Sequence, residues 1–364
     1  MSKRIRVAVI FGGRSNEHVI SCISAGGVMR ALDRDRYEVV PIGITKTGKW
    51  VLESDDASRL VITNGVFPEV DENNIPVLFT ADTNSAGLVI QSDVPQVLQQ
   101  VDVVFPVLHG PFGEDGTIQG LLELAGIPYV GSGVFASAAA MDKGHLKSMM
   151  RAAGIPVGPF EVVTDLQWQT DQEAVLDRLS NLGLPLFVKP SRAGSSVGIS
   201  KVKSYAELIG AIDFARTHDP KVIVEASMEN TREIECGVLS TPDGPRASVC
   251  AEIIVKAGHE FYDFDAKYVD DSVELSVPAK LDPAIQSRAQ QLAIDAFLAI
   301  DAEGLARVDM FVTGDEIVIN EINTMPGFTP ISMYPRMWAE SGVDYPALVD
   351  ALVQDALRRG VGLR

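Results

Sequence analysis

The sequence is short of cysteine. Its 364 residues include only Cys22, Cys236 and Cys250, with no CxxC spacing among them. An odd, scattered set predicts neither a disulfide framework nor a zinc site, and it is typical of a reducing cytoplasm. No apolar run reaches the ~18 residues that a membrane-spanning helix needs, and the run in "MSKRIRVAVIF" is too short for a signal peptide. We therefore expect a soluble, cytoplasmic protein with no membrane partner.

Basic residues are also in deficit. The chain has 31 lysines and arginines against 49 aspartates and glutamates, and a formal net charge of −18. A nucleic-acid-binding protein needs a basic face, so this balance argues against such a partner while leaving room for a local basic pocket. The sequence contains no GxxxxGK[ST] and no well-placed GxGxxG. A nucleotide would therefore have to be bound by another design.

What the sequence does contain is a regular alternation of strand-like and helix-like segments. Strands are predicted at 5–11, 37–45 and 101–108, with helical patterns between them, which indicates a parallel α/β sheet. Ligands bind beyond the carboxyl ends of such strands, where the turns "GGRSNEH" and "HGPFGEDG" lie. With this length, we expect two or three domains.

The pattern changes near Gly131. The segment 136–154, "ASAAAMDKGHLKSMMRAAG", predicts one Ala-rich helix that ends at Gly154, and a longer helix is predicted at 283–299. Strands and irregular polar stretches fill the rest of the chain. We divide the chain into three predicted parts: 1–131, 132–226 and 227–364.

The segment "ARVDMFVTGDEIVINEIN" predicts two antiparallel strands. A three-residue loop at 314–316 would place Asp309 opposite Glu321 and Arg307 opposite Asn323, with all four side chains on one face. A two-residue loop would put Asp309 opposite Asn320 and turn Glu321 away. We predict the first register.

Two carboxylates and an amide oxygen on one face suit a hard cation such as Mg²⁺, which takes its other ligands from water and phosphate. The alternative is a solvated face with an Arg–Asp ion pair. The apolar remainder of both strands predicts burial, where unpaired carboxylates are unfavourable, so it favours the cation.

The stretch 188–200, "VKPSRAGSSVGIS", has a composition that fits a linker, a turn or a phosphate-binding loop. It directly follows an apolar strand, which argues against a linker. Glycines expose backbone N–H groups to an anion, and Lys189, at the strand end, adds a positive charge. The alternative for Lys189, as for Lys143 and Lys267, is a solvated surface lysine.

Eight motifs follow one another along almost the whole chain: "GGRSNEH", "HGPFGEDG", "MDK", "FVKPSRAGSSVGISKV", "REIECGVL", "AKY", "ARVDMF" and "NEINTMPGFTPISMYP". Together they resemble the D-alanine–D-alanine ligase family of the ATP-grasp superfamily. The resemblance implies an α/β protein of three domains, α+β in its ATP-grasp part, with the nucleotide between two antiparallel sheets. It also implies ATP-dependent joining of two D-alanines through an acyl phosphate for peptidoglycan precursors, two Mg²⁺ or Mn²⁺ ions, and a homodimer.

The resemblance further implies roles for individual residues. Glu17 would hold the ammonium group of the first D-alanine, and the Arg307 side chain and Gly327 N–H would stabilise an oxyanion. The implied catalytic residues are Glu17, Ser195, Tyr268, Arg307 and Gly327. The implied substrate-binding residues are His109, Ser332 and Met333. The implied nucleotide-binding residues are Lys143, Lys189, Ser196, Glu225, Ala226, Ser227, Met228, Glu233, Lys267 and Asn320. The implied metal ligands are Asp309, Glu321 and Asn323.

Without the resemblance, several of these residues have ordinary alternatives. Glu17 alternatively is an acidic residue in the first turn of a helix, and His109 is a histidine whose hydrogen bonds are satisfied within a turn. Ser195 alternatively favours a turn, and Tyr268 is an exposed aromatic residue in a loop. Two rival functions are another ATP-grasp ligase, such as one joining D-alanine to D-lactate, and a non-catalytic nucleotide sensor. Tyr268 favours the dipeptide, since relatives that use D-lactate often have His or Phe there. A complete set of metal ligands with Arg307 argues against the sensor.

Overall fold

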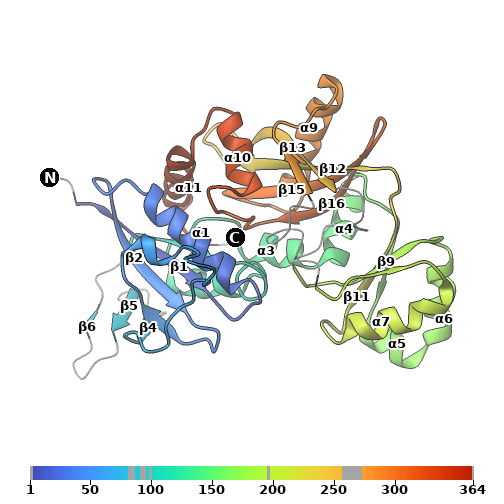
Figure 1. The fold of residues 1–364 in the computed structure, drawn as a ribbon, viewed down its shortest axis with the longest axis horizontal. Coiled ribbons are helices and arrows are strands. Elements are labelled where there is room, and N and C mark those ends of the chain that lie inside the picture. The colour runs from blue at the N-terminus through green and yellow to red at the C-terminus, as the bar shows by residue number, and fades with distance from the viewer. Residues whose placement is uncertain are drawn as a thin grey trace.

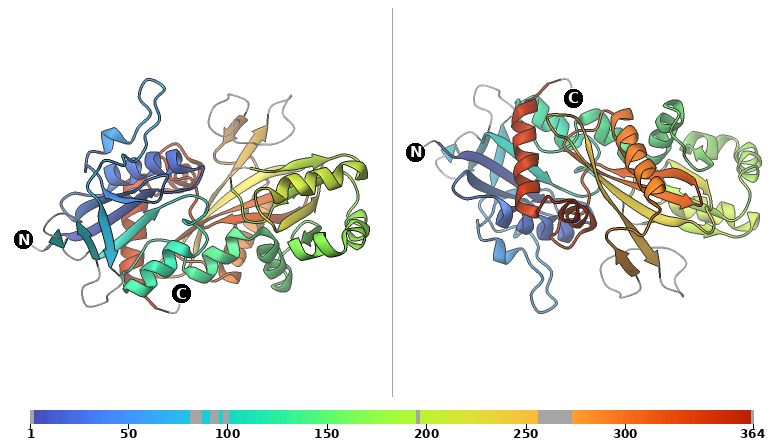
Figure 2. Two further views of the ribbon diagram at one scale, coloured as in Figure 1. Left: turned by 90° about the horizontal axis from the view of Figure 1, so that it is seen from below. Right: turned by 90° about the horizontal axis from the view of Figure 1, so that it is seen from above.

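A parallel sheet forms one end of the molecule in this computed structural model. Strand β1 (Ile5–Gly12) pairs in parallel with β2 (Tyr37–Ile44) and β7 (Val103–Val107), as predicted, and β3 (Trp50–Leu52) adds an antiparallel edge. Figures 1 and 2 show this sheet at one end of the long axis and a smaller antiparallel sheet at the other. The structure describes residues 3–80, 87–90, 96–97, 101–194, 197–255 and 273–362.

Both faces of the parallel sheet are covered, which is why its strands are almost continuously apolar. On one face, strand β1 packs against α1 (His18–Ala31), and on the other against α2 (Thr117–Ala125). The first of these cores also takes in the last helix, α11 (Tyr345–Arg359). A small sheet, β4 (Val77–Thr80), β5 (Gly87–Ile90) and β6 (Gln96–Val97), lies beside it.

The second sheet is antiparallel and lies in the middle of the chain. Its strand order is β10-β9-β11-β8, and helices pack on one face. Along β9, Leu186 and Val188 are buried in this core, while Phe187 and Lys189 alternate to the other face. The strands are β8 (Phe160–Val163), β9 (Leu186–Pro190), β10 (Ser200–Val202) and β11 (Val222–Ala226), and the helices are α5 (Asp165–Thr170), α6 (Gln172–Ser180) and α7 (Leu208–Arg216).

The third sheet, also antiparallel, has the order β14-β13-β12-β15-β16. The predicted helix at 283–299 is confirmed as α9 and covers one face, while α10 (Met333–Glu340) packs against β12 and β13. In β15, Val308 and Met310 point into the α9 core, so Arg307 and Asp309 point away from it. The strands are β12 (Arg232–Leu239), β13 (Arg246–Val255), β14 (Val273–Ser276), β15 (Leu305–Thr313) and β16 (Glu316–Asn323).

The single helix predicted for 136–154 is wrong. Two helices form instead, α3 (Val134–Met141) and α4 (Lys143–Ala152), because the backbone is extended at Asp142 (φ −90°, ψ 95°). The Asp142 carboxylate caps the second helix by accepting a hydrogen bond from the His145 N–H at 3.1 Å. Lys143 therefore begins a new helix.

The predicted part boundaries at 131 and 226 stay predictions. As for membranes, the helices in the described ranges include none that is both long and apolar enough to cross a bilayer.

Candidate active site

A cleft of about 920 Å³ opens between the parallel sheet and the two antiparallel sheets. Its volume is at the upper end of the about 300–1,000 Å³ that is usual for small-molecule sites. Every predicted site residue within the described ranges lines it: Glu17, His109, Lys143, Lys189, Glu225, Ala226, Ser227, Met228, Glu233, Arg307, Asp309, Asn320, Glu321, Asn323, Gly327, Ser332 and Met333. The predicted residues Ser195, Ser196, Lys267 and Tyr268 lie outside the described residues.

The β15–β16 hairpin has the predicted pairing but not the predicted loop. Asp309 lies opposite Glu321 and Arg307 opposite Asn323, as expected. The three-residue loop is wrong, since Thr313 pairs with Glu316 and only two residues form the turn. The register shifts by one residue between Met310, which pairs with residue 319, and Asp309, which pairs with Glu321. Asn320 is therefore the extra residue of a β-bulge, and this bulge makes the two-residue turn compatible with the predicted pairing.

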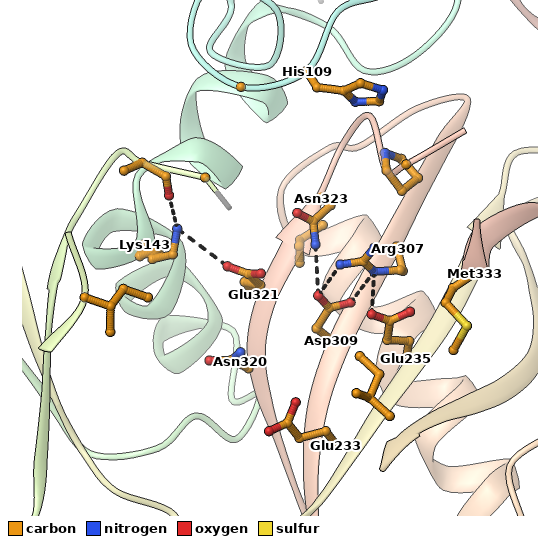
Figure 3. Close-up of a pocket in the computed structure, with 18 of the residues that line it drawn as sticks. His109, Lys143, Glu233, Glu235, Arg307, Asp309, Asn320, Glu321, Asn323 and Met333 are labelled. Carbon is orange, nitrogen blue, oxygen red and sulfur yellow. Dashed lines mark hydrogen bonds and ion pairs between the residues drawn. The ribbon is translucent and has the colours of Figure 1, made fainter. Parts of the chain in front are cut away.

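The paired residues form a compact charged face. Arg307 donates from Nε to Asp309 Oδ1 at 2.7 Å and from Nη2 to Oδ2 at 2.6 Å, and the Asn323 amide donates to Asp309 Oδ2 at 3.0 Å (Figure 3). Glu235 Oε1 lies 3.3 Å from Arg307 Nε. Burial acts to lower the pKa of Arg307, but the charges of Asp309 and Glu235 raise it well above its ordinary value. Arg307 is therefore a permanent cation in a cluster with excess negative charge.

This face suits a metal ion that is shared with a substrate. Across the residues that the structure describes, no group of three or more His, Cys, Asp and Glu side chains forms a self-contained metal site. Asp309, Glu321 and Asn323 would instead supply a partial set of oxygen ligands. Mg²⁺ is bound in that way, by one or two carboxylates, with water and phosphate oxygens completing the octahedron.

Lys143 faces these carboxylates from α4. Its Nζ donates to the Ala193 carbonyl at 2.8 Å and lies 3.5 Å from Glu321 Oε2 (Figure 3). Its backbone N–H donates to the Ser191 carbonyl at 3.0 Å, so the start of α4 and the Gly-containing loop after β9 are held together. The ammonium group thus lies between that loop and the third sheet.

A second charged cluster is built around Glu225 and Lys189, which also line the cleft. Glu225 binds two lysines: its Oε2 is 2.7 Å from Lys189 Nζ, and its Oε1 is 3.2 Å from Lys147 Nζ. Burial would raise the pKa of Glu225, but the charges of Lys147 and Lys189 lower it to about 2. Lys147 is only 3% exposed, and burial lowers its pKa. Sequence reasoning missed Lys147, although its spacing of four from Lys143 places both on one helix face.

On the opposite wall, the turns after β1 and β7 bring Glu17 and His109 to the cleft. Buried His109 approaches the Met325 carbonyl through Nδ1 at 3.0 Å and Ser24 Oγ through Nε2 at 3.2 Å. Burial lowers the pKa of His109, although the charge of Glu17 opposes this shift, so the ring is neutral at pH 7. Glu114, in the same "HGPFGEDG" motif, also lines the cleft and was missed. Burial, and secondly the charge of Glu17, raises the pKa of Glu114 to about 8.

The loop after β16 carries the remaining predicted residues. Ser332 is the N-cap of α10, and its Oγ accepts a hydrogen bond from the Thr329 N–H at 3.1 Å. Gly327 lies against this turn, since a Cβ there would be 3.2 Å from Ser332 Oγ. The close approach leaves little room for a side chain at Gly327.

Comparisons with known proteins agree along the whole chain. Residues 6–132 match the family model described as D-ala D-ala ligase N-terminus, and residues 149–354 match D-ala D-ala ligase C-terminus. A D-alanine–D-alanine ligase of Nocardia farcinica is 58% identical, with 100% of both chains covered. A relative of the same name from Streptomyces griseus is 54% identical, with 100% of this chain and 95% of the relative covered.

Solved structures are similar as well. The VanG D-Ala:D-Ser ligase of Enterococcus faecalis is 38% identical with a TM-score of 0.86, and the match covers 97% of this chain and 100% of that one. The D-alanine–D-alanine ligase of Coxiella burnetii is 35% identical with a TM-score of 0.82, covering 98% and 95%. Both similarities extend over the three sheets that enclose the cleft.

Proposed function

The chain belongs to the D-alanine–D-alanine ligase family, and we propose that its cleft is where ATP drives the joining of two D-alanine molecules. The observation that carries this assignment is the meeting of Arg307, Asp309 and Glu321 with Lys143 in one cleft. Bringing an anionic nucleotide to an anionic carboxylate requires charge neutralisation of this kind. The product would serve peptidoglycan precursor synthesis.

ATP is proposed to lie between the two antiparallel sheets. Lys143 and Lys189 would contact its phosphates or the adenine region, because both project into the cleft from the two sides of the loop after β9. The end of β11, from Glu225 through residues 226–228, would form the adenine hinge. Glu233 would bind the ribose, and Asn320, the bulge residue, which lines the cleft, would complete the nucleotide contacts.

Asp309, Glu321 and Asn323 would hold two Mg²⁺ or Mn²⁺ ions. When bound, these ions neutralise charge on the phosphates during phosphoryl transfer. Asp309 shares its carboxylate with Arg307, so the guanidinium group keeps this side chain oriented toward the cleft.

The chemistry has two steps. The carboxylate of the first D-alanine attacks the γ-phosphate, which gives an acyl phosphate and ADP. The amine of the second D-alanine, after losing a proton, attacks the acyl carbonyl, and the tetrahedral intermediate expels phosphate. Arg307 and the Gly327 N–H would stabilise the oxyanion. Glu17 would bind the first ammonium group, neutral His109 would line the first subsite, and Ser332 with Met333 would seat the second D-alanine.

The residues outside the described ranges keep their predicted roles as part of this proposal. Ser195 and Tyr268 would link with Glu17, while Ser196 and Lys267 would contact the phosphates. We further propose that the enzyme is a homodimer and works in the cytoplasm, because the resemblance implies the dimer and ATP is supplied there.

The test is product analysis with ATP and Mg²⁺. D-Alanine alone is expected to give D-alanyl-D-alanine with one ADP per dipeptide, whereas added D-lactate or D-serine is expected to compete poorly. No turnover with D-alanine alone, but turnover once D-lactate or D-serine is added, would overturn the dipeptide assignment. Unchanged D-alanine-dependent ADP release by Glu321→Ala would overturn the assignment of the metal site.

A further inference from the structure

The loop that follows β7 contacts both backbone polar groups of Met325, in the loop that follows β16. Glu114 Oε1 accepts a hydrogen bond from the Met325 N–H at 3.2 Å, and His109 Nδ1 lies 3.0 Å from the Met325 carbonyl. Glu114 Oε2 accepts a second bond, from the Gly110 N–H, at 2.6 Å. Each Glu114 oxygen thus meets a backbone N–H from a different wall of the cleft.

Met325 lies two residues before Gly327. On the other side of Gly327, the Phe328 carbonyl accepts a hydrogen bond from the Tyr345 hydroxyl at 2.7 Å, and the Phe328 ring is fully buried. Gly327 therefore lies between two fixed points, Met325 and Phe328. The direction of the Gly327 N–H depends on both of them, and of the two only the Met325 anchor comes from the wall that carries His109 and Glu17.

Only a carboxyl group meets the demand at this position. Two N–H groups point at the two oxygens of one side chain, and both oxygens keep lone pairs that accept these bonds whether or not the group holds a proton. A glutamine offers one acceptor oxygen and would point its NH₂ group at the other N–H. The bond to Met325 or the bond to Gly110 would then be lost and replaced by a donor–donor contact.

We propose that Glu114 is a positioning residue that sets the Gly327 N–H against the acyl carbonyl and so favours attack by the second D-alanine over attack by water. This inference rests on the proposed function. Water attack on the acyl phosphate returns D-alanine and phosphate, so ATP is consumed and no dipeptide forms. If the loop that carries Gly327 is misplaced, we expect ATP consumption to be uncoupled from dipeptide formation in this way.

The experiment measures ADP and D-alanyl-D-alanine together, at saturating ATP and D-alanine. The wild type is expected to form one ADP per dipeptide. Glu114→Gln is expected to lower the dipeptide rate at least tenfold and to raise the ADP-to-dipeptide ratio above two, with KM for ATP changed less than twofold. A loss of active protein would lower both rates equally and leave the ratio at one.

The matched control is Asp115→Asn. Asp115 accepts hydrogen bonds from the N–H groups of Phe112 at 2.9 Å and Thr117 at 3.0 Å, so it stabilises the same loop without bridging to Met325. The ADP-to-dipeptide ratio of Asp115→Asn is expected to stay at one. Should Glu114→Gln fail to fold, Glu114→Asp is used. This variant keeps a carboxyl group but withdraws it from the Met325 N–H, and a raised ADP-to-dipeptide ratio is expected there too.

The outcomes are distinct. A ratio of one in the Glu114 variant, or an equal rise in Asp115→Asn, overturns the positioning role. A wild-type enzyme that forms no dipeptide from D-alanine overturns the proposed function instead, before any variant is compared.

Discussion

Replacing Lys147 by methionine is expected to change stability little, although it removes a buried ion pair. At 3.2 Å from Glu225, the ammonium group gains about 5 kcal/mol of attraction at an effective dielectric constant of about 20. Burial of that ammonium costs several kcal/mol, and Lys189, bound to the same carboxylate, repels it. These contributions nearly cancel, and methionine has similar length. We expect the free energy of unfolding to change by no more than about 1–2 kcal/mol.

Glu225→Gln is the informative partner of this variant. It leaves the buried Lys147 and Lys189 ammonium groups without the carboxylate that both contact, which is expected to cost about 3–5 kcal/mol. The double variant, Lys147→Met with Glu225→Gln, should be more stable than Glu225→Gln alone, because one of the two unmatched cations is gone.

The assay is urea denaturation of the four proteins at pH 7. The carboxylate of Glu225 contributes fully there, since its stabilising effect is present above the ordinary pKa of 4.5 and is lost only as the pH falls through about 2. The electrostatic reasoning is refuted if Lys147→Met is as destabilising as Glu225→Gln. It is equally refuted if the double variant loses the sum of the two single losses.

Three further predictions concern other parts of the cleft. Glu114 holds a proton in the folded state between its ordinary pKa of 4.5 and about 8, so the free energy of unfolding should fall as the pH rises through this window. The fall should be at most about 1.4 kcal/mol per pH unit. In urea titrations at several pH values, Glu114→Gln should show a smaller pH dependence than the wild type. Mg²⁺ with ATP should raise Tm in the wild type but not in Asp309→Asn, as thermal shift would show. Asp219, which accepts from the Arg192 backbone and side chain, anchors the loop after β9, so Asp219→Asn should raise KM for ATP severalfold and leave KM for D-alanine unchanged. An unchanged KM for ATP would contradict this.

The register of the β15–β16 hairpin was predicted correctly for the wrong reason. The expected three-residue loop is absent, and a two-residue turn with a bulge at Asn320 gives the same pairing of Asp309 with Glu321. A signal for the bulge was present: β16 reads "EIVINEIN", in which strict alternation fails at Asn320 and Glu321. The pattern of adjacent polar residues marks the place where the strand gains a residue.

The break between α3 and α4 was less accessible from the sequence. Alanine favours helix strongly, so the Ala-rich run gave no reason to stop at Asp142. The cap is stabilised by distant groups, since Asp142 also accepts hydrogen bonds from Ser191 at 2.9 Å and Lys221 at 2.7 Å. Lys147 and Glu114 were missed for the same reason, because Glu225, which contacts Lys147, and Met325, which contacts Glu114, lie far away in the chain. The motifs located the cleft, whereas these supporting contacts required the fold.

The packing of α11 has a consequence for synthesis on the ribosome. Its Leu348, Val349 and Leu352 pack into the core that covers one face of strands β1, β2 and β7, which are made within the first 107 residues. The two antiparallel sheets, by contrast, are assembled from strands that have all been translated by Asn323. The parallel sheet is therefore translated first, but its core is completed last, when α11 has been made. Nascent chains that stall before α11 would present that apolar face to chaperones.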